Sequence, residues 1–124
     1  MQTLFLKIFG EPASKANSRK MVYVRGKPMF IKSAKALAYA KAFKQQCVIA
    51  PSEVFFECDV AVTIRIWYAS RRPDLDESLI LDLLQEVAYK NDRQVKEKHI
   101  YWELDRVNPR CEIEVSEIKK ATIA

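Results

Sequence analysis

The sequence predicts a single α+β domain in which two helices pack on one face of a small mixed β-sheet. The chain has 124 residues, of which 49% are hydrophobic and two are glycine, so it is long enough for one compact core and too short for two. Apolar side chains recur at every second residue in some segments and at helical spacings in two others. The expected order of strand, hairpin, helix, strand, helix, strand and strand is typical of the α+β class.

A strand and a β-hairpin are expected first. Residues 3–9 alternate well enough for a strand, and the Gly-Glu-Pro sequence at residues 10–12 ends it. Two β-prone segments, residues 21–25 and 28–31, are separated by a Gly-Lys pair. This arrangement predicts a hairpin.

The first helix is expected over residues 34–48, with Ser33 as its N-cap and Pro51 closing the element. Its apolar residues fall at mixed three- and four-residue spacings, with lysines elsewhere, as in an amphipathic helix. These residues are Leu37, Ala38, Phe43 and Cys47. A long strand over residues 54–68 follows, with one mainly apolar side. That side consists of Val60, Val62, Ile64 and Ile66.

The second helix is expected over residues 79–87, where apolar residues recur with the spacing of one buried helical face. Residues 95–104 and 110–118 complete the sheet as two strands joined by a turn. Cys111, Ile113 and Val115 form the inward side of the last strand. We expect the domain to span residues 1–118 and residues 119–124 to form a frayed tail.

Composition limits the function classes. The apolar runs are interrupted by charges well before the roughly 18 residues that a membrane span needs, and residues 1–9 lack the pattern of a signal peptide. We therefore expect a cytoplasmic protein with no membrane partner. The three cysteines are far apart and have apolar neighbours, which favours buried reduced thiols over disulfides or a zinc site. They are Cys47, Cys58 and Cys111.

Charge divides the chain into a basic part and an acidic part. The net charge is +5, yet residues 1–50 hold ten Lys or Arg and one acid, whereas residues 51–124 hold eleven bases and fifteen acids. Within the basic part, residues 14–20 alternate small hydrogen-bonding residues with cations, as expected of a loop that meets phosphates. The alternative is that these lysines only solubilise a surface. The asymmetry favours an anionic partner.

Acidic residues gather after the long strand, at Asp74, Asp76 and Glu77, and Asp92 follows the second helix. Residues i and i+2 of an extended backbone point to one side, so Asp74 and Asp76 can converge on one cation. No His or Cys is nearby, and an all-oxygen ligand set selects Mg²⁺ or Mn²⁺ over zinc. Asp92 reaches that cation only if the chain reverses direction at the second helix. Helix capping by Asp76 and Glu77 is the alternative, and the local pattern alone favours it.

Five blocks of sequence carry a resemblance to a known family. The central blocks are Arg72-Pro73-Asp74-Leu75-Asp76, Leu81-Asp82-Leu83-Leu84, and the segment from Val87 to Val95. The outer blocks are Gly10-Glu11-Pro12 with Ser14-Lys15, and the segment from Asn108 to Val115. In this order, and over most of the chain, they resemble the RusA family of Holliday junction resolvases. The central blocks are the specific ones.

The resemblance implies an activity. RusA-like enzymes are small homodimeric endonucleases, typical of phage and prophage, that bind four-way DNA junctions and make paired Mg²⁺-dependent cuts. By this resemblance Asp74, Asp76 and Asp92 match the aspartates of the catalytic metal site, and Asp82 matches a further acidic position. Mn²⁺ is expected to substitute for Mg²⁺, and no organic cofactor is implied.

The chain departs from the family at the start of the second helix. The family places Asn and then a lysine there, whereas this chain has Glu77 followed by apolar residues, and its next lysine is Lys90. Three interpretations remain. Glu77 has joined the metal site while Arg72 or Lys90 serves the phosphate; cleavage is slower or altered in substrate; or the protein binds DNA without cutting it. The first is favoured, because all three aspartates remain and Glu77 adds an oxygen ligand.

These observations predict a Mg²⁺-dependent endonuclease that acts as a homodimer on branched DNA. The expected metal ligands are Asp74, Asp76 and Asp92, with Glu77 as an additional ligand. The expected DNA contacts are Lys15, Arg19, Lys20, Arg25, Lys27, Arg71, Arg72 and Lys90. A salt bridge to Asp74 is the alternative for Arg71 or Arg72. The rival functions are a non-catalytic branched-DNA-binding protein and a basic domain that binds RNA or a protein.

Overall fold

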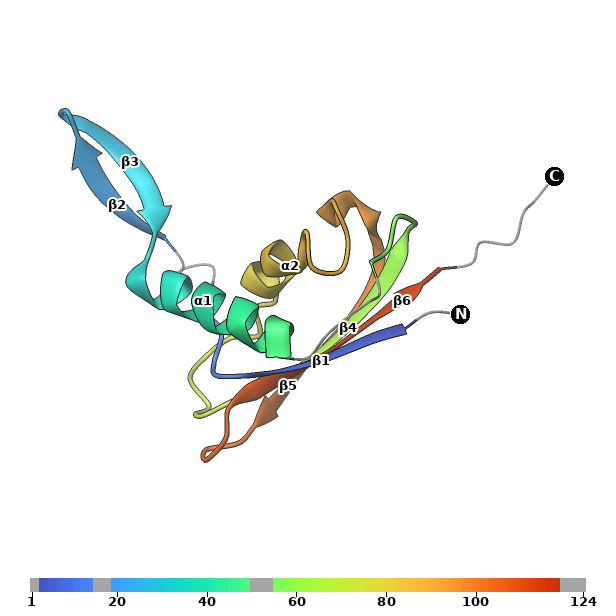
Figure 1. Cartoon of the computed structure of the whole chain (residues 1–124). Coiled ribbons are helices and arrows are strands. Elements are labelled where there is room, and N and C mark those ends of the chain that lie inside the picture. Colours follow the sequence, from blue (N-terminus) through green and yellow to red (C-terminus); the bar gives the residue numbers. More distant parts are fainter. Residues whose placement is uncertain (1–2, 15–18, 50–54, 119–124) are drawn as a thin grey trace.

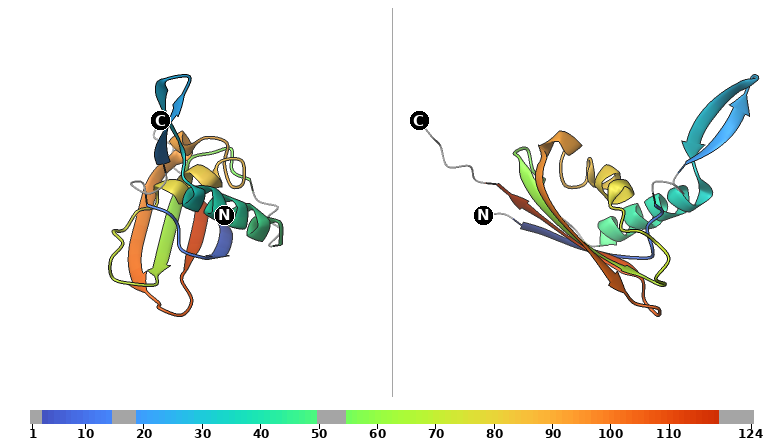
Figure 2. Two further views of the ribbon diagram at one scale, coloured as in Figure 1. Left: turned by 90° about the vertical axis from the view of Figure 1, so that its left-hand side faces the viewer. Right: turned by 180° about the vertical axis from the view of Figure 1, so that it is seen from behind.

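The structure is a computed structural model that describes residues 3–14, 19–49 and 55–118 (Figure 1). It contains a four-stranded sheet, a separate β-hairpin and two α-helices on one face of the sheet (Figures 1 and 2). The predicted α+β class with a mixed sheet is therefore confirmed. The expected helix stop at Pro51, the phosphate contact of Lys15 and the tail at 119–124 lie outside the described residues.

The strand order of the sheet is β1-β6-β4-β5. β6 lies antiparallel to both β1 and β4, whereas β5 runs parallel to β4. The strands are β1 (Thr3–Phe9), β4 (Val60–Tyr68), β5 (Val95–Leu104) and β6 (Arg110–Glu117). The last two strands are thus not neighbours, because β4 lies between them.

The turn between β5 and β6 crosses the end of β4. Asp105 organises this turn, because its Oδ1 accepts hydrogen bonds from the backbone N–H groups of Val107 and Asn108 and its Oδ2 accepts one from Arg110. These bonds lower the pKa of the Asp105 carboxyl. The Asp105 backbone N–H donates to the Tyr68 carbonyl at 2.8 Å, so the turn also fixes the point where the chain leaves β4.

Alternate residues of the sheet form the buried core beneath the helices. In β4, the expected apolar side is fully buried, and the predicted inward side of β6 is buried as well. These residues are Val60, Val62, Ile64, Ile66, Cys111, Ile113 and Val115. The long strand begins at Val60 rather than at residue 54; Phe56, before it, forms a bridge with Tyr89.

Helix α1 (Ala34–Ile49) presents a different face to the core from the one expected. Ala36, Tyr39 and Phe43 are buried, whereas Leu37 is 55% exposed and Ala38 is exposed. The expectation of Leu37 and Ala38 as inward residues was wrong, because several apolar residues follow one another here and the spacing fits more than one stripe. The amide of Gln46 also exchanges two hydrogen bonds with the backbone of Phe9, which ties α1 to β1.

Helix α2 (Ser78–Leu84) is shorter than the expected 79–87. The backbone becomes extended at Gln85 and left-handed at Glu86, with φ of 71°. This break lets Ala88 and Tyr89 turn back into the core, where both are fully buried. The helix therefore ends three residues earlier than expected, and the Tyr89 ring is buried instead. None of the described helices is long and apolar enough to cross a membrane.

The expected hairpin is formed by β2 (Arg19–Val24) and β3 (Lys27–Lys32). Its turn is Arg25-Gly26 rather than the expected Gly26-Lys27. Both turn residues have positive φ, 53° and 77°, as in the two-residue turns that match the twist of a hairpin. The hairpin projects away from the sheet beyond the start of α1 (Figures 1 and 2).

The three cysteines are free thiols, as expected, but they differ in burial. Cys111 is buried, Cys47 is half-buried and Cys58 is exposed, so the expectation that all three are buried was wrong for Cys58. Cys111 Sγ lies 3.3 Å from the Tyr39 hydroxyl, which links β6 to α1. Burial raises the pKa of the Cys111 thiol to about 11, which keeps it protonated and unreactive at neutral pH.

The buried face of α1 gives a test of the core. Replacing Phe43 by Ala is expected to lower the free energy of unfolding by about 3–5 kcal/mol, because a fully buried ring is lost and a cavity remains. Leu37→Ala on the same helix should cost less than about 0.5 kcal/mol, because Leu37 is exposed. Urea unfolding followed by circular dichroism measures both values. A larger loss for Leu37→Ala would contradict this packing.

Candidate active site

The loop that carries Asp74 and Asp76, here called the acidic loop, follows β4. It is held by residues at the ends of the parallel strands β4 and β5. The Tyr68 and Trp102 rings, at the ends of β4 and β5, stack with centroids 5.8 Å apart. Trp102 Nε1 donates to the carbonyl of Pro73 at 2.9 Å, and the backbone N–H of Asp76 donates to the Tyr68 hydroxyl at 3.2 Å. The loop that carries Asp74 and Asp76 is thus fixed at two points by the sheet.

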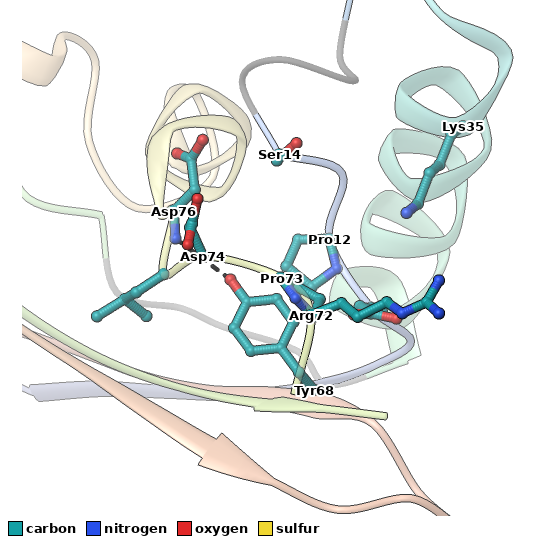
Figure 3. Close-up of a pocket in the computed structure, with 10 residues that line it drawn as sticks. Pro12, Ser14, Lys35, Tyr68, Arg72, Pro73, Asp74 and Asp76 are labelled. Atoms are coloured by element: carbon teal, nitrogen blue, oxygen red, sulfur yellow. Dashed lines mark hydrogen bonds between the residues drawn. The ribbon is translucent and has the colours of Figure 1, made fainter. Parts of the chain in front are cut away.

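A cavity of about 750 Å³ opens beside this loop (Figure 3). It lies where the end of β1, the first turn of α1 and the segment after β4 meet. Its lining residues are Glu11, Pro12, Ser14, Lys35, Tyr68, Arg72, Pro73, Asp74, Leu75 and Asp76. Figure 3 shows Asp74 and Asp76 on one side, by the start of α2, and Lys35 and Arg72 on the other, toward α1.

Negative charge collects around the Tyr68 hydroxyl. The pKa of Tyr68 is raised, mainly by burial, and the charges of Asp76, Glu11 and Glu77 raise it further, against the lowering effect of its hydrogen bond with Asp76. Three carboxylates from two separate segments therefore act on one buried hydroxyl.

Asp76 also serves as a local cap. Its Oδ1 accepts hydrogen bonds from the Ser78 backbone N–H at 3.0 Å and from the Ser78 hydroxyl at 2.6 Å. Glu77 occupies the N-cap position of α2 without a side-chain capping hydrogen bond, and its Oε1 lies 3.4 Å from Lys98 Nζ. The capping alternative therefore describes Asp76 but not Glu77.

Asp92 is exposed and lies in a separate turn, η2 (Asp92–Gln94). Burial raises the pKa of the Tyr89 hydroxyl, and the charges of Asp92 and Asp82 raise it further, so both acids act near Tyr89. Asp92 is not among the described residues that line the cavity. In residues 3–14, 19–49 and 55–118, no three His, Cys, Asp or Glu side chains are placed to hold a metal ion together.

The expected DNA-contacting cations fall into two groups. Arg72 lines the cavity, and Arg71 and Lys90 are exposed elsewhere on the body of the domain. The others that the structure describes lie on the hairpin; they are Arg19, Lys20, Arg25 and Lys27. Among the described ion pairs, those of arginine join Arg65 to Glu103 and Arg110 to Asp105 and Glu112, so the alternative of a bridge from Arg71 or Arg72 to Asp74 is not observed there.

Sequence reasoning gave no site role to Glu11, Lys35 or Lys98. Glu11 and Lys35 are far from the acidic motif in sequence, and only the fold brings them to the cavity. The position of Lys98 could have been predicted from the alternation of residues along its strand. Strand alternation places Lys98 on the same face as Trp102, the face that turns toward the acidic loop.

The acidic residues that line the cavity offer the kind of donor atom that a hard cation prefers, although no three of them are placed to hold one ion in the described residues. Asp74, Asp76 and Glu11 offer only oxygen atoms, as Mg²⁺ and Mn²⁺ prefer. Two of these carboxylates sit at positions i and i+2 of one anchored loop, whereas the third comes from the end of β1. These carboxylates are therefore an incomplete set of metal ligands in the described part of the chain.

Comparison with known proteins agrees with the fold. No curated protein matches the chain. The family described as Endodeoxyribonuclease RusA matches residues 10–116, which include both sides of the cavity and the turn with Asp92. This match spans most of the 124 residues. The chain therefore belongs to the RusA family of endodeoxyribonucleases.

Proposed function

We propose that this protein is a Mg²⁺-dependent endonuclease that resolves four-way or related branched DNA junctions by paired phosphodiester cuts. The observation that carries the proposal is the cavity in which Asp74 and Asp76 face Lys35 and Arg72, inside a domain of the RusA family. One side of this cavity suits a cation and the other suits a phosphate. Mn²⁺ is expected to substitute, since both ions prefer oxygen ligands.

Asp74 and Asp76 would hold the cation, with Glu11 at the same cavity and Asp92 as the further ligand implied by the family. Bound Mg²⁺ supplies a polarised phosphoryl oxygen and a water activated for in-line attack. The chain's part is to keep the carboxylates in place. The Tyr68 hydroxyl does so by accepting a hydrogen bond from the backbone N–H of Asp76. Trp102 does so by donating a hydrogen bond to the carbonyl of Pro73.

Lys35 and Arg72 would bind the DNA backbone across the cavity from the carboxylates. The charge that develops on the scissile phosphate needs a further cation. We assign this role to Lys98, because it contacts Glu77 at the start of α2, where the family carries its lysine. Of the cations weighed from the sequence, Arg72 points toward α1 (Figure 3) and Lys90 is exposed after α2.

We also propose that the protein acts as a homodimer. Paired cuts in two equivalent strands require two sites in matching orientation, which a two-fold axis provides.

A second candidate is a branched-DNA-binding protein that has lost turnover. The observation that favours it is that the described residues bring no third carboxylate into metal-binding geometry with Asp74 and Asp76. The distinction between the two candidates is therefore one of catalysis rather than of DNA binding.

The variant Asp76→Asn tests the metal site. We expect the wild type to cut a labelled four-way junction at symmetrical positions with Mg²⁺ or Mn²⁺ and the variant to cut undetectably, because a charged oxygen ligand is replaced by an amide. The matched control is Glu57→Gln, an exposed acid outside the cavity, which should cut at the wild-type rate. Tight junction binding by the wild type without cuts under either metal would favour the second candidate.

The variant Lys98→Gln tests the proposed phosphate cation. Its single-turnover cleavage rate should fall about 100-fold, the usual effect of removing one group that stabilises transition-state charge. Junction affinity measured in EDTA should change little, because the contact forms chiefly in the transition state. Lys96→Gln, the same change two residues earlier on β5, is the control and should keep its rate. Equal losses in both variants would show only a general effect of charge.

A further inference from the structure

The hairpin of residues 19–32, here called the arm, has an unusual surface for a free-standing element. Every arm residue except Val22 is exposed. Its two strands pair with each other in a sheet of their own and project from the domain (Figures 1 and 2). Two-stranded hairpins are only marginally stable alone in water. An arm of this kind gains from contact with a partner.

One face of the arm exposes large apolar side chains. Met21 pairs with Phe30 and Tyr23 pairs with Pro28 across the two strands, so all four share one face. Tyr23 is 70% exposed and Phe30 is 71% exposed, among the highest values for aromatic residues in the described chain. Clustered exposed apolar groups mark interaction sites.

The charge of the arm identifies the class of partner. Its 14 residues include five cations and no Asp or Glu; the cations are Arg19, Lys20, Arg25, Lys27 and Lys32. Arg19 pairs with Lys32 on the aromatic face, at the base of the arm. Two such arms would repel each other, so a second arm does not fit this surface. A polyanion with flat apolar groups does, and single-stranded or unpaired DNA has both properties.

The arm is joined to the cavity at both of its ends. Ser14, before the arm, and Lys35, just after it, both line the cavity. Six-residue strands extend roughly 20 Å, and a two-stranded ribbon of this size can enter a DNA groove. DNA that places a phosphate in the cavity would therefore have its neighbouring nucleotides within reach of the arm.

We propose that the arm opens DNA at the branch point, with Tyr23 and Phe30 stacking on unpaired bases and the arm cations holding the adjoining phosphates. This inference rests on the proposed function, because it assigns the recognition of branched DNA to a surface outside the cleavage site. Base–aromatic stacking tolerates any sequence, so the arm selects for unpaired bases rather than for a base sequence.

The test uses the full chain and a four-way junction that carries 2-aminopurine beside the branch point, in EDTA so that no cutting occurs. Wild-type binding should raise the 2-aminopurine fluorescence, or quench it further by direct stacking; either change relative to the free junction reports a base that has left its DNA stack. The double variant Tyr23→Ala, Phe30→Ala should abolish this change and weaken junction binding at least about 30-fold, because stacking on two rings is lost.

Phe5→Ala is the matched control, because Phe5 is 69% exposed but lies on the sheet face away from the helices. It should leave both the fluorescence change and the affinity intact. A wild-type complex with no fluorescence change, or a double variant that keeps it, would overturn the proposal. So would equal losses in the double variant and in Phe5→Ala.

Sedimentation velocity separates DNA contact from contact with another copy of the chain. If the double variant is a monomer where the wild type is a dimer, the arm binds a second subunit and the proposal is wrong. If both have the same mass and unfold at the same temperature, the loss of binding belongs to the arm. Because these readouts need no cleavage, an inactive wild type would contradict the nuclease proposal and still leave the arm supported.

Discussion

The parallel pairing of β4 with β5 is the constraint on which the site depends. Because the two strands run in the same direction, Tyr68 and Trp102 reach the same edge of the sheet and stack there. Each ring then uses its polar atom to hold the acidic loop, one through Asp76 and the other through Pro73. An antiparallel β5 would bring its other end to this edge, and both the aromatic pair and its hold on Pro73 would be lost. The position of the carboxylates is thus a consequence of sheet topology.

The chain segments that form the two sides of the cavity were not all predicted equally well from the sequence. Strands β1 and β5 have the bounds expected from the sequence, whereas β4 begins later than expected. The buried face of α1 and the end of α2 were misplaced, since neighbouring apolar residues allow more than one helical stripe and the burial of Tyr89 is a tertiary effect. The Asp74 and Asp76 pair follows from local spacing. The arrival of Glu11 and Lys35 at the same cavity does not, because it needs the path of the whole chain.

If Asp92 is a metal ligand, as we propose, the site has a conformational component. Its turn is held by a capping box around Asn91 and by Gln94, whose side-chain amide donates to the carbonyls of Phe56 and Cys58 at 2.8 Å. Bringing Asp92 to a cation at the cavity would act against this network, in which each hydrogen bond contributes about 1 kcal/mol. Cation affinity and the order of the segment after α2 would then be coupled, as they are wherever ligands gather only when the ion binds.

The exposed thiol of Cys58 has a practical consequence. Its own carbonyl accepts a hydrogen bond from Gln94, so the residue is attached to the turn that contains Asp92 while its side chain faces solvent. A fluorophore or spin label attached there would sit beside the turn that must move if Asp92 is to join Asp74 and Asp76 at the proposed metal site. The chain thus carries a native attachment point for a spectroscopic reporter of the proposed metal site.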